Sequence, residues 1–262
     1  MAAVSTRHAT GAAGHATDPR HVNRRIPPQA KAALPAVVIV GRSNGTRSPL
    51  LDLVVAELAG RGMPVLVFET RRQRTSRWFR QEQSRFLAPL VPDIATARAP
   101  AKVALRLAFK AALLVSHPWR LDHLLTRPFR NRPPVVQLRR FLRAQGVRPL
   151  ILVSHSAGGV AGAMAEGLPQ VCGHVCLGYP FRHPGRSDEP YRTRPLARVR
   201  HPMLIVQGDA DAYGTAATAA RYDLAPAVTV LSVRSDHDYD RLPAEDVAAV
   251  VQAVRQMVDR PA

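Results

Sequence analysis

Short runs of apolar, β-branched residues alternate with helical patterns along much of this chain. Ala36–Val40 and Pro64–Phe68 are runs of this kind, and apolar residues follow a helical spacing from Leu50 to Leu58 between them. Strands that are apolar throughout are buried on both faces, which is typical of a parallel sheet covered by helices on both sides. The pattern therefore predicts an α/β fold with a mostly parallel sheet.

The same alternation resumes after residue 149. Strands are expected at Leu150–Val153, Val171–Leu177, Met203–Val206 and Val228–Val233, and helices at Ala157–Gly167, Thr215–Tyr222 and Ala244–Val258. A chain of 262 residues can bury a sufficient core without disulfides or a structural metal. Cys172 and Cys176 are four residues apart in one expected strand, so we predict two free, buried thiols on the same strand face.

The net charge of +18 is concentrated in one part of the chain. Residues 70–145 contain 17 basic and three acidic residues, a net charge of +14. Residues 1–69 contain eight basic and four acidic residues, and residues 146–262 contain twelve of each. The basicity is therefore a property of a middle segment between two nearly neutral parts.

This basic segment also interrupts the alternation of strands and helices. A helix is expected from Ala99 to about Val115, where three basic residues at spacing four form a charged stripe: Lys102, Arg106 and Lys110. A second helix is expected over Val135–Gln145, leading back to the sheet. We interpret residues 72–134 as a helical, basic insertion that caps the edge of the sheet.

The N-terminal residues differ from the rest in composition. Residues 1–32 are rich in Ala, Gly, Thr, His and Arg, which predicts a disordered arm before a domain at 33–262. They contain no apolar run typical of a secretory signal, and no window of 18 uncharged apolar residues occurs. We expect a cytoplasmic protein, with peripheral membrane association as an open alternative.

The junction Leu150–Gly159 (LILVSHSAGG) has the features of a strand-to-helix turn that presents a nucleophile. A buried strand runs directly into a helix, and small residues, Ser154 and Gly158, stand two positions on either side of Ser156. A sharp turn needs small neighbours there, and it exposes the serine oxygen above the sheet. The motif matches G-x-S-x-G with Ser154 in place of the first glycine. The alternative interpretation is an ordinary helix N-cap serine.

Two further strand ends carry the groups that an activated serine needs. Asp209 and Asp211 follow the strand Met203–Val206, and His237 follows Val228–Val233. Carboxyl ends of parallel strands share one edge of a sheet, so the serine, an aspartate and the histidine can converge there.

The order and spacing of these residues resemble the α/β-hydrolase superfamily. The segments Cys176–Arg186 (CLGYPFRHPGR) and Leu204–Thr215 (LIVQGDADAYGT) are similar to small hydrolases related to dienelactone hydrolase. The resemblance implies that Ser156 is the nucleophile, Asp211 the acid and His237 the general base. Asp211 is preferred to Asp209 because the group's motif places the acid three residues after the strand-ending glycine.

The resemblance also implies an oxyanion hole. Its donors would be the Ala157 amide and an amide of the loop after the first strand, with Arg42 or Ser43 as the candidates. The loop Gly41–Thr46 is not expected to bind phosphate, because no lysine follows its second glycine and G-x-G-x-x-G is absent. The acidic residues around His237, which are Asp236, Asp238 and Asp240, have a common spacing, and we expect neither a metal nor a cofactor there.

Two classes of function remain open from the sequence. The first is a serine hydrolase of the carboxylesterase type acting on a small acyl substrate; an acyltransferase or a cofactor-free haloperoxidase could use the same three residues. The second is a non-catalytic binding protein whose residues 72–134 dock on an anionic membrane surface, another anionic ligand or nucleic acid. Nucleic acid is the less expected partner, because aromatic residues for base stacking make up only 5% of the chain. The oligomeric state is left open.

Overall fold

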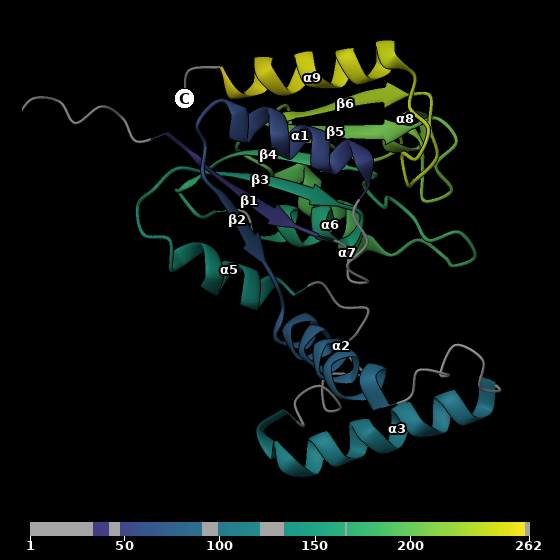
Figure 1. Cartoon of the computed structure of the whole chain (residues 1–262). Helices are drawn as coiled ribbons and strands as arrows, with labels where there is room; N and C mark the ends of the chain where they lie inside the picture. Colours follow the sequence, from purple (N-terminus) through teal and green to yellow (C-terminus); the bar gives the residue numbers. More distant parts are fainter. Residues whose placement is uncertain (1–33, 42–47, 91–98, 121–133, 166, 260–262) are drawn as a thin grey trace, which may run out of the picture. The chain divides into compact units, whose positions relative to one another are not determined.

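Six parallel strands form the central sheet in the described part of the chain, which is residues 34–41, 48–90, 99–120, 134–165 and 167–259 of a computed structural model. The strands are β1 (Ala36–Val40), β2 (Val65–Phe68), β3 (Leu150–His155), β4 (Val171–Leu177), β5 (Met203–Gly208) and β6 (Val228–Val233). Their order in the sheet is β2-β1-β3-β4-β5-β6 (Figure 1). The predicted parallel sheet is confirmed.

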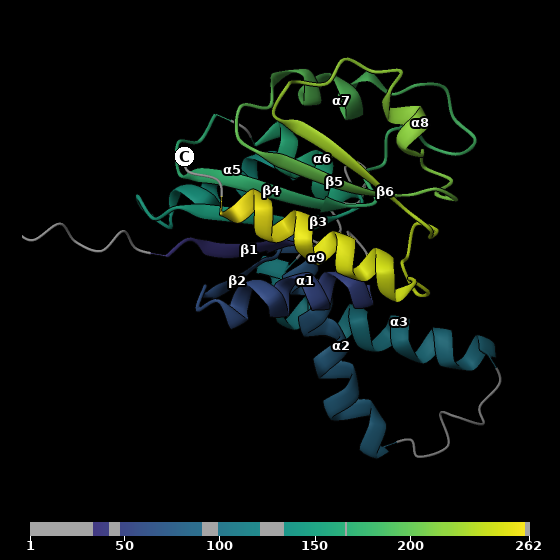
Figure 2. The ribbon, with the colours of Figure 1, turned by 90° about the horizontal axis from the view of Figure 1, so that it is seen from above.

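Helices cover both faces of this sheet (Figure 2). Alternate residues of β1 separate the two layers: Val37 and Ile39 pack with α1 (Pro49–Gly60) and α9 (Ala244–Val258). Val38 and Val40 pack on the other face with α5 (Val135–Arg143) and α6 (Ala157–Met164). The second face also holds three short elements, α7 (Pro190–Thr193), η4 (Arg194–Arg198) and α8 (Ala216–Ala219). The predicted α/β fold class with helices on both faces is confirmed.

The register of the strands brings their carboxyl ends together at one edge. Val40 of β1 pairs with Ser154 of β3, and Ser154 pairs with Cys176 of β4. Leu177 of β4 pairs in turn with Val206 of β5. The loops that follow β1, β3, β4 and β5 therefore begin side by side, which is where ligands bind in open α/β sheets.

Three helices are shorter than the sequence predicts, and the one expected over Val135–Gln145 is α5, which ends at Arg143. The expected helix Thr215–Tyr222 is the single turn α8; Thr215 is its N-cap and accepts the Thr218 amide at 3.3 Å. The expected helix Ala157–Gly167 ends at Met164. Alanine-rich segments have a high helix propensity, but tertiary contacts decide where they end.

The described residues of the basic insertion are helical. Its elements are α2 (Arg71–Leu90), which begins one residue before the expected boundary, α3 (Ala99–Ser116) and the turn η2 (Pro118–Arg120). Residues 91–98 and 121–133 of the insertion lie outside the described residues, as does the predicted arm at 1–32. No described helix has the length and hydropathy needed to cross a membrane. The role of the insertion as a cap stays a prediction.

The prediction that both cysteines lie on one strand face is wrong. The pairing of β4 with β3 skips a residue, since Leu150 pairs with Val171 and Ile151 with Gly173. This bulge shifts the alternation of side chains at Cys172. Cys172 therefore packs against the core under α1 and α9, whereas Cys176 is buried on the opposite face. Both thiols are free.

Candidate active site

Ser156 occupies a strained turn between β3 and α6. Its backbone has φ 54° and ψ −124°, and φ is positive at a residue that is not glycine. Such a conformation is uncommon for a residue with a Cβ atom and is found mostly at functional sites. A sharp strand-to-helix turn thus lies between β3 and α6, and Ser156 is half-buried at its apex.

Glycines let α6 approach the sheet closely behind this turn. A Cβ atom at Gly158 would lie 2.1 Å from the carbonyl oxygen of Val40. One at Gly159 would lie 2.2 Å from the Cys176 sulfur. The sequence motif requires small residues two positions from the serine, and in the structure the residue three positions after it, Gly159, must also be small. The signal for it was the doubled glycine itself.

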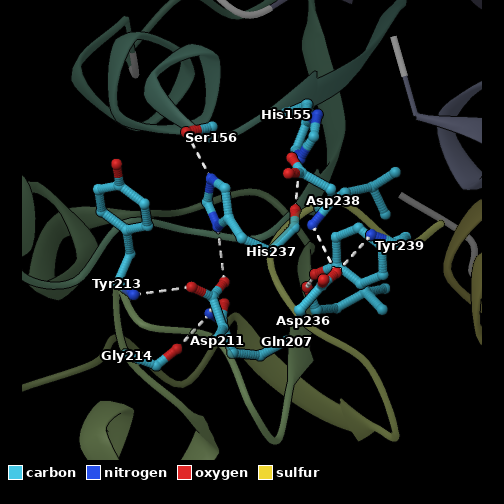
Figure 3. A network of polar contacts seen from close by, with 12 residues as sticks. His155, Ser156, Gln207, Asp211, Tyr213, Gly214, Asp236, His237, Asp238 and Tyr239 are labelled. Carbon is cyan, nitrogen blue, oxygen red and sulfur yellow. Dashed lines mark hydrogen bonds and ion pairs between the residues drawn. The ribbon is translucent and has the colours of Figure 1, made fainter. Parts of the chain in front are cut away.

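Ser156, His237 and Asp211 form a chain of hydrogen bonds (Figure 3). The Ser156 hydroxyl lies 2.9 Å from Nε2 of His237, and Nδ1 of His237 lies 2.7 Å from Oδ2 of Asp211. The carboxylate can only accept at this bond, so Nδ1 carries a proton and Nε2 is left to accept the serine hydroxyl. In this geometry the imidazole can take the serine proton during a nucleophilic attack.

Asp209, the other candidate acid, lies elsewhere. Its Oδ1 accepts the amide of Ser235 at 3.1 Å, and its side chain is exposed. It thereby connects the loop after β5 to the loop after β6. The structure brings Asp211, and not Asp209, to His237.

The Asp211 carboxylate is buried and held by three donors. Besides His237, the Gln207 side chain donates to Oδ2 at 2.8 Å and the Tyr213 amide donates to Oδ1 at 2.7 Å. Gln207 also donates to the carbonyl of Gly214, which fixes its own orientation. Neither Gln207 nor Tyr213 was predicted from the sequence to belong to the site. A signal existed for Gln207, because it is the polar residue in the otherwise apolar strand β5.

The loop that carries His237 is a closed turn. Oδ1 of Asp236 accepts the amides of Asp238 and Tyr239 at 3.0 and 3.2 Å. Tyr239 has φ 60°, and its hydroxyl donates to the carbonyl of Val206 at 2.7 Å. The acidic residue before the histidine thus caps a turn. Among the described residues, no three His, Cys, Asp or Glu side chains are grouped so that they could hold a metal ion.

A further contact joins the elbow to this loop. Nε2 of His155, the residue before the serine, donates to the main-chain carbonyl of His237 at 3.0 Å. His155 is buried, and its ring also lies against the Tyr239 ring with centroids 6.0 Å apart. The strand end that carries the serine and the loop that carries the histidine are therefore fixed to one another.

Tyr213 covers the imidazole of His237. The two ring centroids lie 4.5 Å apart, with the rings tilted by 38°. On another side, a Cβ atom at Gly178 would lie 3.0 Å from Nδ1 of His237. The imidazole therefore sits in a narrow slot, and its side chain is only 12% exposed.

We expect Tyr213→Ala to lower kcat for a soluble ester by roughly ten- to hundredfold, because small displacements of a reacting group are costly. The backbone amide that holds Asp211 remains in this variant. Tyr213→Phe keeps the ring, and so its kcat should stay within about threefold of the parent. Steady-state kinetics of both variants test this, and an equal loss in the two would refute the role of the ring.

One predicted oxyanion donor is described and two are not. Ala157 is exposed at the first position of α6, directly after Ser156. Arg42 and Ser43 lie outside the described residues. The carbonyl oxygen of Gly41 is 3.2 Å from where a Cβ atom of Gly158 would stand. The loop after β1 thus begins beside the elbow.

Ser154 makes a separate serine–histidine pair. Its Oγ lies 2.7 Å from Nε2 of His174, and both side chains are fully buried. Burial lowers the pKa of His174 to about 3, with a further contribution from the nearby His201. A buried serine cannot reach a substrate, so this pair belongs to the packing beneath the elbow. It explains how Ser154 is tolerated where the motif has glycine: its hydroxyl has a partner.

The buried His174 predicts a loss of stability in acid. In the unfolded chain it titrates near its ordinary pKa of 6.5, whereas in the folded chain it binds no proton until about pH 3. The unfolded state therefore binds the extra proton in this window, and the free energy of unfolding falls as the pH falls, by up to about 1.4 kcal/mol per pH unit. Urea denaturation between about pH 7 and pH 4 measures the slope. His174→Asn should flatten it, and an unchanged slope would contradict the assignment.

The sheet, the elbow and the residues at its carboxyl edge define the α/β-hydrolase class of fold. Residues 128–260 match the family described as "Alpha/beta hydrolase domain". The chain therefore belongs to the α/β-hydrolase family. The match does not distinguish a subgroup, so the resemblance to relatives of dienelactone hydrolase stays a prediction.

Two solved structures are similar to this chain over most of its length. The esterase domain of a Rhodothermus marinus protein is similar over 87% of this chain and 87% of its own, with 15% identity and a TM-score of 0.48. A cold-adapted esterase from an Arctic intertidal metagenomic library is similar over 86% of this chain and 83% of its own, with 13% identity and a TM-score of 0.46. No curated protein sequence matches the chain.

Proposed function

We propose that the protein is a serine hydrolase of the carboxylesterase type that cleaves esters or related acyl bonds. The observation that carries this proposal is the continuous hydrogen-bond chain from Ser156 through His237 to Asp211 at the apex of a strained turn. An N-cap serine, the alternative interpretation, accepts an amide of its own helix. No side-chain cap bond is found for Ser156.

The reaction would proceed through an acyl-enzyme. The Ser156 oxygen attacks the carbonyl carbon while Nε2 of His237 takes its proton, and Asp211 orients the imidazole and stabilises its positive charge. The Ala157 amide, with a second amide at Arg42 or Ser43, would hold the oxyanion. His237 then gives its proton to the leaving alcohol. Water, deprotonated by the same imidazole, attacks the acyl-enzyme, which releases the acid and restores the Ser156 hydroxyl.

The contacts around Ser156, His237 and Asp211 favour catalysis over a purely binding role. A binding protein has no need for a carboxylate held by three donors behind an imidazole, or for a serine in a strained conformation. Strain at a residue costs free energy and persists where function requires it. An acyltransferase or a haloperoxidase would use the same acyl-enzyme and differ only in whether an alcohol or peroxide replaces water.

Labelling with a fluorophosphonate probe tests the proposal directly. The parent protein should lose its hydrolytic activity and gain one covalent adduct, located on Ser156 by mass spectrometry of its peptides. A protein that is not labelled, or is labelled elsewhere, would overturn the proposal. A panel of p-nitrophenyl esters of increasing acyl length then defines the substrate class, and added alcohols test for acyl transfer.

A further inference from the structure

The helix α3 exposes an apolar face to solvent. Val103, Leu107 and Val115 lie at helical spacing and are 55%, 61% and 82% exposed. The alanines that share their side of the helix are also exposed: Ala104, Ala108 and Ala111. We call these six residues the outer α3 face. A helix on a globular protein normally turns its apolar stripe inward, so this arrangement is the reverse of the usual one.

The other side of α3 packs against α2. Phe109 lies near Phe86, with ring centroids 6.3 Å apart, and the Lys110 ammonium lies 5.1 Å from the centroid of the Phe79 ring. Just beyond the end of α3, the His117 ring meets Trp78 at 4.9 Å. Lys110 thus belongs to the contact between the two helices, and not to the outer α3 face. The sequence placed Lys110 on a charged stripe and could not show that its side chain lies against α2.

A hollow beside this helix is lined by three arginines together with aromatic and polar side chains. A cavity of about 420 Å³ is lined by arginines of α2 together with two tryptophans: Arg71, Arg74, Arg77, Trp78 and Trp119. Arginine forms paired hydrogen bonds with phosphate oxygens. Trp119 lies in η2, three residues after the end of α3, and is 69% exposed. Tryptophan partitions to the boundary between lipid headgroups and acyl chains.

Two partners could cover the outer α3 face: a second copy of the chain or a lipid bilayer. The positive charge of residues 70–145 favours the bilayer. A second copy of the chain would bring its residues 70–145, with 17 basic and three acidic residues, close to those of the first, so the two would repel. A bilayer rich in anionic lipids attracts basic segments, and its acyl region accepts aliphatic side chains. Apolar and cationic surface together match a membrane interface better than either feature does alone.

We propose that the insertion docks on an anionic lipid bilayer, with α3 lying in the plane of the interface. The outer α3 face enters the boundary of the acyl chains, and the arginines of α2 contact the phosphates. This proposal is independent of the hydrolase chemistry, because none of its residues belongs to the Ser156 site.

Binding of the full chain to vesicles tests the docking. We expect co-sedimentation with vesicles of about 40 mol% phosphatidylglycerol in phosphatidylcholine, at least tenfold weaker binding to pure phosphatidylcholine, and a similar weakening when the salt is raised to about 0.5 M. The two tryptophans of the chain, Trp78 and Trp119, both lie in the insertion. Their emission should therefore shift to shorter wavelength only with the anionic vesicles.

A pair of double variants separates the apolar face from simple charge attraction. Leu107→Glu/Val115→Glu places charges on the outer α3 face and should weaken vesicle binding at least tenfold. Val136→Glu/Val147→Glu adds the same charge at apolar positions that are 78% and 99% exposed outside α3, and should leave most of the binding. Circular dichroism and Tm check that all variants fold, as their exposure predicts.

Three results would overturn the proposal. The first is no binding to anionic vesicles even at low salt. The second is equal binding by the two double variants, which would mean that charge alone attracts the protein. The third is a dimer, seen by size-exclusion chromatography, that Leu107→Glu/Val115→Glu dissociates, which would make a second copy the occupant of this face.

Discussion

Replacing Ser156 by alanine is expected to lower kcat for a p-nitrophenyl ester by roughly five orders of magnitude. The substitution removes the nucleophile, and the remaining donors only bind and polarise the substrate. KM should change little, because the Oγ atom forms its bond with the substrate in the transition state and not before. Steady-state kinetics on purified protein measure both constants, and fluorophosphonate labelling should disappear in parallel.

Ser154→Ala is the matched control for this change. It removes the same atom two residues away, from a side chain that is fully buried against His174. We expect this variant to unfold more easily by about 1–3 kcal/mol, since the His174 nitrogen loses its partner. Its kcat should stay close to that of the parent protein. If Ser154→Ala lost activity and Ser156→Ala kept it, the proposed nucleophile would be wrong.

Replacing Gly158 by alanine is expected to destabilise the fold by roughly 3 kcal/mol and to lower Tm by about 10 °C. The new Cβ atom would lie 2.1 Å from the Val40 carbonyl oxygen, which belongs to the backbone of a central strand and cannot rotate away. The helix α6 would have to move off the sheet and take the Ser156 turn with it. Activity should therefore fall even at temperatures where the variant remains folded. Thermal denaturation and kinetics at a low temperature measure the two effects separately.

Gly60→Ala is the control for a glycine without such a contact. Gly60 is the last residue of α1, and no atom lies within 4 Å of its expected Cβ position. Alanine there should leave Tm within about 2 °C of the parent or raise it slightly, because alanine is the better helix former. A Gly158→Ala protein as stable as Gly60→Ala would show that the close contact between α6 and β1 does not exist.

The strands and the three site residues were predictable because they depend on local patterns. A run such as Ala36–Val40 is apolar throughout, and such runs are typical of a parallel sheet covered on both sides. Parallel strands then carry whatever follows them to one edge of the sheet. This topological consequence is why Ser156, Asp211 and His237 could be grouped although up to 81 residues separate them in sequence.

The contacts that complete the site were not predictable in the same way. Gln207 near the end of β5 and Tyr213 in the loop after it both donate to Asp211, but these contacts depend on how that loop closes. The bulge that separates the faces of Cys172 and Cys176 arises from the pairing of β4 with β3. An alternating pattern presupposes a regular strand, and a single unpaired residue reverses it.

In the basic insertion, the sequence determined that α3 forms, and the tertiary structure determined which of its sides is buried. The amino-acid sequence by itself determined that α3 is a helix with Lys110 on a charged stripe and apolar residues elsewhere, because helical spacing is a local property. Only the tertiary structure decided which side faces inward: the aromatic side chains of α2 pack against the side of Phe109 and Lys110, which leaves Val103, Leu107 and Val115 outside. The direction in which an amphipathic helix turns is set by the free energy of its contacts with another element, and that partner lies in a different part of the chain.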